Sequence, residues 1–197
     1  FNIMGNSHVI LKDIVFTNAI GEDGSAIMVN YGSVVEVIGC TFINNDATDC
    51  GGAIYIIADD SSKVSKITNS IFENNKALNG GAIYLHASNI NISGLSPYMI
   101  KLIMDNVGVR HSLIANCIAE HDGGAGYVYG NHGVVENLTM INNTAHHDGG
   151  AGYVVGNYGH LYDSKFINNT AYNDGGALLW KGVNGTINNI TVVGNNA

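Results

Sequence analysis

Two His-Asp pairs are the residues of this sequence best suited to chemistry. His121-Asp122 and His147-Asp148 stand 26 residues apart, and Asp174 follows Asp148 at the same interval. Carboxylates that are brought together repel one another, so a cation between them is favourable, and imidazole is a common ligand of transition metals. These five residues are the candidate ligands of a divalent cation, and we expect no other cofactor. The structural alternative is that Asp caps a turn while His fills an exposed position.

A second candidate site is aromatic. Four tyrosines share one position, three residues after the second glycine of a Gly-Gly pair, and Trp180 lies close by. They are Tyr55, Tyr84, Tyr127 and Tyr153. If the neighbouring isoleucines point inward, these tyrosines point outward, where aromatic rings either stack on sugar rings or stabilise adjacent strands. Gly126 and Gly152, which stand where other copies have Ile, leave the inward assignment open.

Both candidate sites recur because the whole chain is a repeat. Gly-Gly-Ala begins at Gly51, Gly80, Gly123, Gly149 and Gly175. An apolar residue followed three positions later by Asn occurs at Phe42/Asn45, Phe72/Asn75, Leu113/Asn116, Met140/Asn143, Phe166/Asn169 and Val192/Asn195, with a weaker copy at Phe16. The period of about 26 residues is typical of a solenoid, in which neighbouring coils complete the core of each coil.

The segments between these landmarks are short and rich in Ile, Val, Thr, Tyr and Phe, and none is long enough to suggest a helix. Strand, turn and strand within each period predict an all-β, single-stranded parallel β-helix of about seven coils, spanning residues 1–197 as one domain. The apolar landmarks from Phe16 to Val192 should form an internal column, and the Asn landmarks a ladder of amides that satisfies the turns.

Composition excludes several classes of partner. The net charge is −8 with only eight Lys plus Arg, which argues against nucleic acid and anionic membranes. No apolar run is long enough to span a membrane. Cys40, Cys50 and Cys117 are read either as core thiols or as containing a Cys40–Cys50 disulfide. The repeat pattern runs to both ends, so we expect a fragment of a longer protein, and we expect it to be monomeric.

One coil carries about fifteen additional residues, at about 87–112. The insertion contains Tyr98, Met99 and Lys101, which the coil does not need, so we predict that ligand binding, if any, involves this segment. The alternative is that it packs back onto the coil or caps an end.

The paired landmarks, Phe-x-x-Asn and Gly-Gly-Ala-Ile, resemble the repeat of chlamydial polymorphic outer-membrane proteins. The Asn-rich form here, Phe-Ile-Asn-Asn-Thr-Ala followed by Asp-Gly-Gly-Ala, looks more like the adhesin-like surface proteins of methanogenic archaea. The resemblance implies a right-handed β-helix, an extracellular location at the cell surface, and attachment to a host or microbial glycan or protein. These motifs belong to the scaffold, so no binding residue carries over from the family.

Three functional classes follow from the sequence. The favoured one is an adhesin-like binding module, and a passive stalk is the alternative. A polysaccharide lyase or hydrolase is less favoured, because it needs paired carboxylates in a cleft or a basic residue beside acidic metal ligands. Here the basic residues are scattered and most acidic residues occupy turns, so we expect no enzyme activity.

Overall fold

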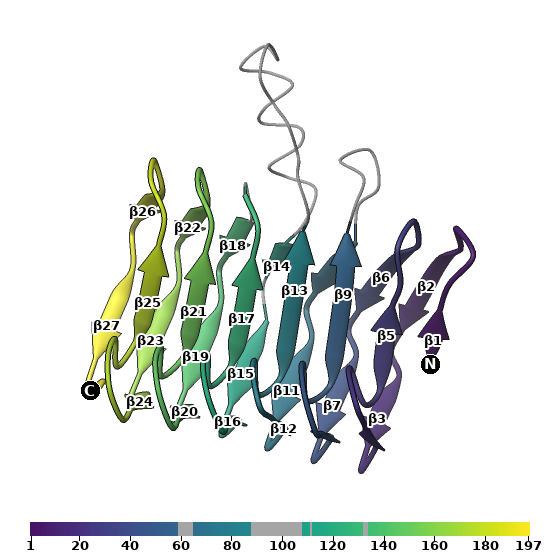
Figure 1. The fold of residues 1–197 in the computed structure, drawn as a ribbon, viewed down its shortest axis with the longest axis horizontal. Coiled ribbons are helices and arrows are strands. Elements are labelled where there is room, and N and C mark those ends of the chain that lie inside the picture. Colours follow the sequence, from purple (N-terminus) through teal and green to yellow (C-terminus); the bar gives the residue numbers. More distant parts are fainter. Residues whose placement is uncertain (59–64, 88–107, 111, 132–133) are drawn as a thin grey trace.

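The computed structural model describes residues 1–58, 65–87, 108–110, 112–131 and 134–197. In these residues the chain winds into a solenoid, and each strand lies parallel to the equivalent strand of the preceding coil. Figure 1 shows the coils side by side along the long axis, with the N-terminus at one end and the C-terminus at the other. The repeat is therefore a right-handed parallel β-helix, as the sequence predicts.

The described residues form four sheets, A to D, and a coil gives one strand to each. Sheet A comprises β1 (Asn2–Ile3), β5 (Ile27–Val29), β9 (Ile54–Ala58), β13 (Ile83–Ala87), β17 (Gly126–Tyr129), β21 (Gly152–Val155) and β25 (Leu178–Lys181). Sheet B comprises β2 (His8–Lys12), β6 (Val34–Ile38), β10 (Lys66–Thr68), β14 (Gly108–Arg110), β18 (Val134–Glu136), β22 (His160–Tyr162) and β26 (Thr186–Asn188).

Sheets C and D complete each coil. Sheet C comprises β3 (Val15–Thr17), β7 (Thr41–Ile43), β11 (Ile71–Glu73), β15 (Leu113–Ala115), β19 (Thr139–Ile141), β23 (Lys165–Ile167) and β27 (Thr191–Val193). Sheet D comprises β4 (Ile20–Gly21), β8 (Asp46–Ala47), β12 (Lys76–Ala77), β16 (Ile118–Ala119), β20 (Thr144–Ala145) and β24 (Thr170–Ala171).

The number of coils is close to the prediction of about seven. Among the described residues sheets A, B and C have seven strands each and sheet D has six. The solenoid therefore has six complete turns and a seventh that lacks a strand in sheet D. No helix in this part of the chain is long and apolar enough to cross a membrane.

The centre of the core is a column of side chains from sheet C. Phe42 and Phe72 are fully buried, and their rings stack with centroids 4.7 Å apart and planes 4° apart. Phe16 continues the stack on the other side of Phe42, at 4.8 Å. Identical residues in successive coils thus lie in van der Waals contact, which confirms the predicted apolar column.

Beside this column runs the predicted ladder of asparagines. Asn143 donates a hydrogen bond from Nδ2 to Oδ1 of Asn169 at 2.9 Å, and its backbone N–H donates to the same oxygen at 3.0 Å. The second Nδ2 hydrogen bond goes to the carbonyl of Ile114, at 3.1 Å. Both asparagines are fully buried, and the ladder satisfies the backbone of the turn between sheets C and D.

The sequence reading of one coil is wrong by one residue. Strand pairing places Ile114, not Leu113, against Phe72, and Ile114 is buried. The ladder position of this coil is consequently Cys117, not Asn116. Asn116 adopts a positive φ of 55°, the conformation that Asn shares with glycine.

The far end of the column also differs from the prediction. Val192 pairs with Phe166 but is 51% exposed, because no further coil covers it in the described structure.

The cysteines are free: Cys40 and Cys117 are buried core thiols, and Cys50 lies in a turn.

Inside sheet A, two glycines leave space in the core. Gly126 and Gly152 pair with Ile83 and Leu178, so they occupy the column that isoleucine fills in earlier coils. The inward assignment that the sequence left open is therefore correct. A cavity of about 70 Å³ lies here, lined by apolar side chains that include Met140.

Candidate functional site

The tyrosine column lies on the outward face of sheet A, between the two inward columns. Tyr55, Tyr84, Tyr127 and Tyr153 pair in register along β9, β13, β17 and β21. Successive ring centroids are 5.2, 4.9 and 4.9 Å apart, with interplanar angles of 15°, 10° and 17°. The structure therefore brings the four predicted tyrosines together as one continuous stack.

The stacking decides which part of each ring a ligand meets. The faces of the inner rings cover one another, so the partly buried Tyr84 and Tyr127 meet a ligand through their edges and hydroxyl groups, whereas Tyr153 is only 7% exposed. A sugar that stacks needs an open ring face. Partial burial also raises the pKa of Tyr55 and Tyr127 to about 12, so their hydroxyls stay protonated even at mildly alkaline pH. The column thus offers a row of hydrogen-bonding hydroxyls.

Trp180 does not belong to this column. It pairs with Val154 in an inward position of sheet A, packs against the core, and donates from Nε1 to the carbonyl of Gly156 at 3.1 Å. The residue after Tyr153 in the outward column is Leu179. Trp180 was placed near the tyrosines by its number alone, and the alternation of the strand turns it to the other side.

The turn between sheets D and A carries the His-Asp pairs. Asp122 and Asp148 precede the Gly-Gly turns and are 7% and 5% exposed. The Oδ1 atom of Asp122 accepts the backbone N–H of Asp148 at 3.1 Å, and Asp148 accepts that of Asp174 at 3.2 Å. Each carboxylate therefore caps the turn of the next coil, which is the structural role that the sequence offered as the alternative.

The side chains of His121 and His147 contact these carboxylates. The imidazole rings of His121 and His147 stack with centroids 4.7 Å apart and planes 11° apart. His121 Nδ1 lies 3.1 Å from Asp122 Oδ2, and His147 Nδ1 lies 3.0 Å from Asp122 Oδ1. One buried carboxylate thus faces two half-exposed imidazoles from successive coils.

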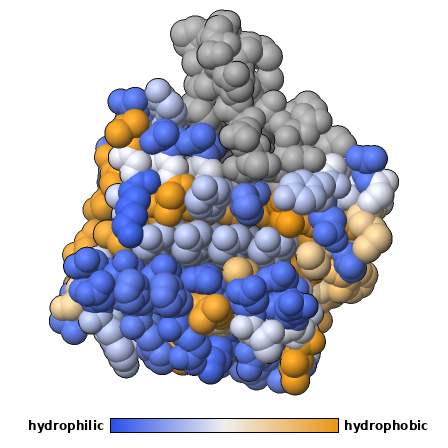
Figure 2. Space-filling model, in the orientation of Figure 1, coloured by the Kyte–Doolittle hydropathy of each residue, from blue (hydrophilic) through white to orange (hydrophobic). Residues whose placement is uncertain are grey.

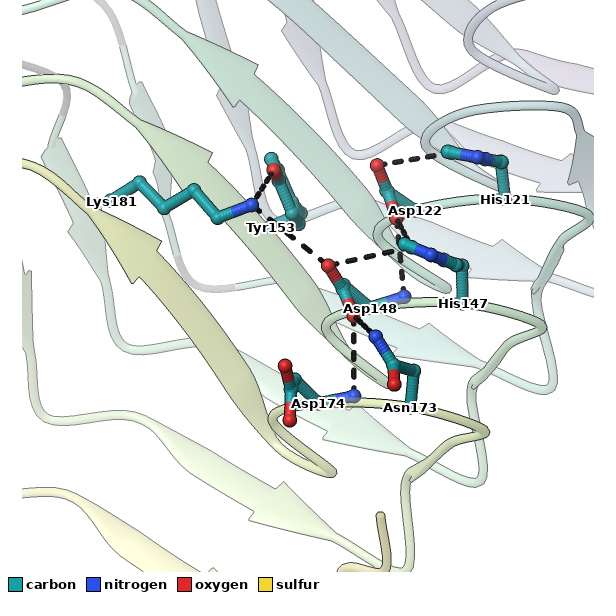
Figure 3. A network of polar contacts seen from close by, with 8 residues as sticks. All are labelled: His121, Asp122, His147, Asp148, Tyr153, Asn173, Asp174 and Lys181. Atoms are coloured by element: carbon teal, nitrogen blue, oxygen red, sulfur yellow. Dashed lines mark hydrogen bonds and ion pairs between the residues drawn. The ribbon is translucent and has the colours of Figure 1, made fainter.

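A network extends this cluster toward the tyrosines (Figure 3). His147 Nδ1 lies 3.4 Å from Asp148 Oδ2, and Lys181 Nζ lies 3.9 Å from the same oxygen. Lys181 also donates to the hydroxyl of Tyr153 at 2.6 Å, which raises the pKa of the lysine. Asp174 takes part through its backbone, and its carboxylate has none of the contacts drawn in Figure 3.

The sequence missed two charged residues, Lys181, which joins the two candidate sites, and Glu120, which lies beside the His-Asp turns. Sequence alone gives Lys181 as one of several scattered basic residues. In the structure Tyr153 pairs with Leu179 of the next coil, and Lys181 lies two residues further along the same strand. Glu120, which precedes His121, pairs with Lys76 and with His146 Nδ1 at 2.8 Å. The hydrogen bond from Lys76 lowers the pKa of Glu120. The repeat register, applied to every polar residue, would have found both.

A second group of ionisable residues lies in the turns of earlier coils, where Asp23, Asp49 and Cys50 approach one another. Asp23 accepts the backbone N–H of Cys50 at 3.1 Å, so it also caps a turn. Burial and the nearby Asp49 raise the pKa of the Cys50 thiol to about 12.

Tyr98, Met99 and Lys101 lie outside the described residues, as does most of the predicted insertion at about 87–112. Their proposed role in binding stays a prediction. The described strands that flank this segment are β13 in sheet A and β14 in sheet B.

Comparison with known proteins supports the repeat assignment. Residues 39–57, 69–86 and 163–179 match the model of the Chlamydia polymorphic membrane protein (Chlamydia_PMP) repeat. Each match contains a strand of sheet C, a strand of sheet D and the Gly-Gly turn, and it ends in a strand of sheet A. Searches of curated proteins and of solved structures gave no significant match. The chain therefore carries repeats of the polymorphic-membrane-protein type, built into a parallel β-helix.

Proposed function

We propose that the chain is an adhesin-like binding module at the cell surface, and that it attaches to a glycan or protein of a host or of another microbe. The polymorphic-membrane-protein-type repeats support a surface location, since the family is described as a membrane protein. The resemblance of the Asn-rich repeats to adhesin-like surface proteins agrees with this role.

The observation that carries the proposal is the polar face over sheet A. The row of tyrosine hydroxyls lies beside the His-Asp turns, and Lys181 connects the two through Tyr153 and Asp148. Figure 2 shows the result as a pale row across the face with a broad hydrophilic area next to it. His121, His147 and Lys181 are not needed to close a coil, because other coils lack them.

The chemistry of this face suits a ligand rich in hydroxyl groups. Tyrosine hydroxyls both donate and accept hydrogen bonds, carboxylates accept them, and the lysine donates. Such groups lie at intervals of one coil, about 4.8 Å, along a rigid surface. An extended glycan or peptide that runs parallel to the solenoid axis would meet them in succession.

A passive stalk is the second candidate, and the regular register supports it. The strands keep one-to-one pairing through all described coils, which suits a rigid spacer. A stalk does not require the coils to differ on their outer face. Leu78 occupies the place before His121, so the stacked His-Asp pairs lie only in the C-terminal half of the described solenoid.

The experiment displays the chain on beads and measures attachment to cells and to glycan arrays. A face variant combines Tyr84→Phe, Tyr127→Phe and Lys181→Ala, which removes hydroxyls and a charge with little effect on the core. A second variant replaces residues 90–106 with a short Gly-Ser linker. As a matched control, Lys165→Ala and Thr139→Ala alter sheet C on another side.

We expect the face variant to lose most attachment and the sheet C control to keep it. Loss only in the linker variant would move the contact to the insertion. Equal, undetectable attachment by all proteins, including the parent, would favour the stalk.

A further inference from the structure

We propose that His121, Asp122 and His147 bind one divalent transition-metal ion. The candidate ligand atoms of these three residues all lie within 4.8 Å of one another. They come from two successive coils, so the bound ion would join neighbouring turns of the solenoid. The proposed metal site is tested separately from the proposed attachment, because ion binding is measured with the purified protein alone.

The three residues are close enough to share a single ion. Zn²⁺ binds imidazole nitrogen and carboxylate oxygen at about 2.0–2.2 Å, so adjacent ligand atoms in its tetrahedral shell lie about 3.3–3.6 Å apart. The two Nδ1 atoms lie 3.1 and 3.0 Å from the two oxygens of Asp122. These contacts are slightly shorter than the spacing of ligands around one ion, so an ion would replace the direct contacts between nitrogen and oxygen. The two parallel imidazoles must also turn toward it, because a metal ion lies in the plane of each imidazole that it binds. Asp148 Oδ2, 3.4 Å from His147 Nδ1, lies at the edge of this site.

The coil stack holds the ligands in place before an ion arrives. The two imidazoles stack on each other, and the backbone N–H of His147 donates to the carbonyl of His121 at 3.0 Å. The backbone N–H of Asp148 fixes the Asp122 carboxylate, which is 7% exposed. The backbone of the two coils and the carboxylate are therefore ordered before an ion binds, and the conformational cost of binding is limited to turning the two imidazole rings.

The donor set selects the class of metal. Two imidazoles with one carboxylate suit Zn²⁺, Ni²⁺ or Cu²⁺, whereas Ca²⁺ and Mg²⁺ prefer a shell of oxygens. The half-exposed histidines leave room for water to complete the shell. The Asp23, Asp49 and Cys50 group offers no comparable set, because it has no imidazole.

The chain suggests its own test variants, because neighbouring coils show which residues are accepted at the position of each histidine. Asn173 follows His147 in the column, so His147→Asn should fold. Leu78 precedes His121, so His121→Leu should fold as well. His146, one residue away, contacts Glu120 instead of Asp122, and His146→Tyr installs the residue found at Tyr172. It is the matched control.

The experiment is isothermal titration calorimetry of the chain with Zn²⁺ at neutral pH, followed by Ni²⁺ and Ca²⁺. We expect one high-affinity Zn²⁺ per chain, with the Kd raised at least about tenfold by His147→Asn and by His121→Leu. His146→Tyr should leave the Kd within about twofold of the parent, and Ca²⁺ should not compete. Circular dichroism and thermal unfolding without metal establish that each variant is folded.

Three results would overturn the proposal. One is the absence of Zn²⁺ binding to the folded parent, which would leave the histidines as hydrogen-bond donors to a capping carboxylate. Another is equal loss of affinity in His146→Tyr, which would place the ion at Glu120. The third is tighter binding of Ca²⁺ than of Zn²⁺, which would point to an oxygen-only site. If one histidine variant does not fold, the other still decides the outcome.

Discussion

At the scale of single residues, neighbouring asparagines with different tasks explain why one coil was misread. In each Asn-Asn pair that directly follows a strand of sheet C, the first Asn adopts positive φ, as Asn142 does at 54°, and the second enters the buried ladder, as Asn143 does. Asn suits both positions, so residue type alone cannot distinguish them. Where the second Asn is replaced by Cys117, only the strand pairing shows that Asn116 is the first.

The interruption of the ladder by Cys117 leads to a prediction. Asn75 Nδ2 donates one hydrogen bond to the carbonyl of Phe42, at 3.0 Å, but along the ladder it meets the sulfur of Cys117, at 3.9 Å, where other coils offer an amide oxygen. In the Cys117→Asn variant, the new side-chain oxygen accepts the hydrogen bond from Asn75, and the new Nδ2 donates a hydrogen bond to the next asparagine of the ladder. We expect the variant to be more stable by about 0.5–1.5 kcal/mol, the net value of one hydrogen bond. Urea denaturation measures this, and a loss of stability would mean that the ladder geometry is different in this coil.

The tyrosine column makes a prediction about alkaline pH. Burial raises the pKa of Tyr127 from the ordinary 10.0 to about 12 in the folded chain. Below pH 10 the residue is protonated in both states, so its contribution to stability is fully present. As the pH rises from 10 to about 12, the unfolded state ionises first and that stability is lost.

The measurement compares the parent with Tyr127→Phe, which cannot ionise, by urea denaturation at a series of alkaline pH values. The stability of the parent relative to the variant should fall over this range. A constant difference would show that the Tyr127 hydroxyl is as well solvated in the fold as in the unfolded chain.

At the scale of elements, alternation along short strands made the core predictable. Each three-residue strand of sheet C points its middle residue inward, and this residue is apolar in each described coil. The same alternation explains why Tyr153 faces outward and Trp180 inward, although both are aromatic residues of sheet A. Aromatic composition alone predicted a common site for them, and strand register separates them.

Strand β11 offers a direct comparison of its two faces. Phe72 is fully buried and stacked on Phe42, so Phe72→Ala should cost about 3–5 kcal/mol of unfolding free energy. Ile71, next to it, is 42% exposed, and Ile71→Ala should cost about 1 kcal/mol. Denaturation of the two variants under one condition tests the pair. Similar losses would refute an inward-facing sheet C column.

At the scale of the whole molecule, the repeat predicted the solenoid because every coil must present the same surface to the next. The features that differ between coils were less predictable. The 26-residue interval brought the two His-Asp pairs together, but the contacts of His147 with Asp122 and of Lys181 with Asp148 depend on how the coils superpose, and the cavity depends on two glycines that break an isoleucine column. Periodicity describes what the coils share, so it carries little information about a feature that occurs in only some coils.

The glycines of one coil make the last prediction, in which the same substitution has opposite effects. A Cβ on Gly126 would meet only the carbonyl of Ile83, at 3.7 Å, and it would extend into the apolar cavity. Gly126→Ala should therefore stabilise the fold by about 1 kcal/mol, since it restricts the unfolded chain and buries a methyl group.

A Cβ on Gly124 would instead lie 2.1 Å from the carbonyl oxygen of Gly150 in the next coil. Backbone of two coils must separate to admit it, so Gly124→Ala should cost at least about 2 kcal/mol. Urea denaturation of both variants gives the signs. If both destabilise, the cavity is closed by neighbouring side chains; if neither does, the coils are packed more loosely than these contacts require. Opposite signs would show that the glycine before the strand sets the distance between coils, while the glycine within it only leaves the core unfilled.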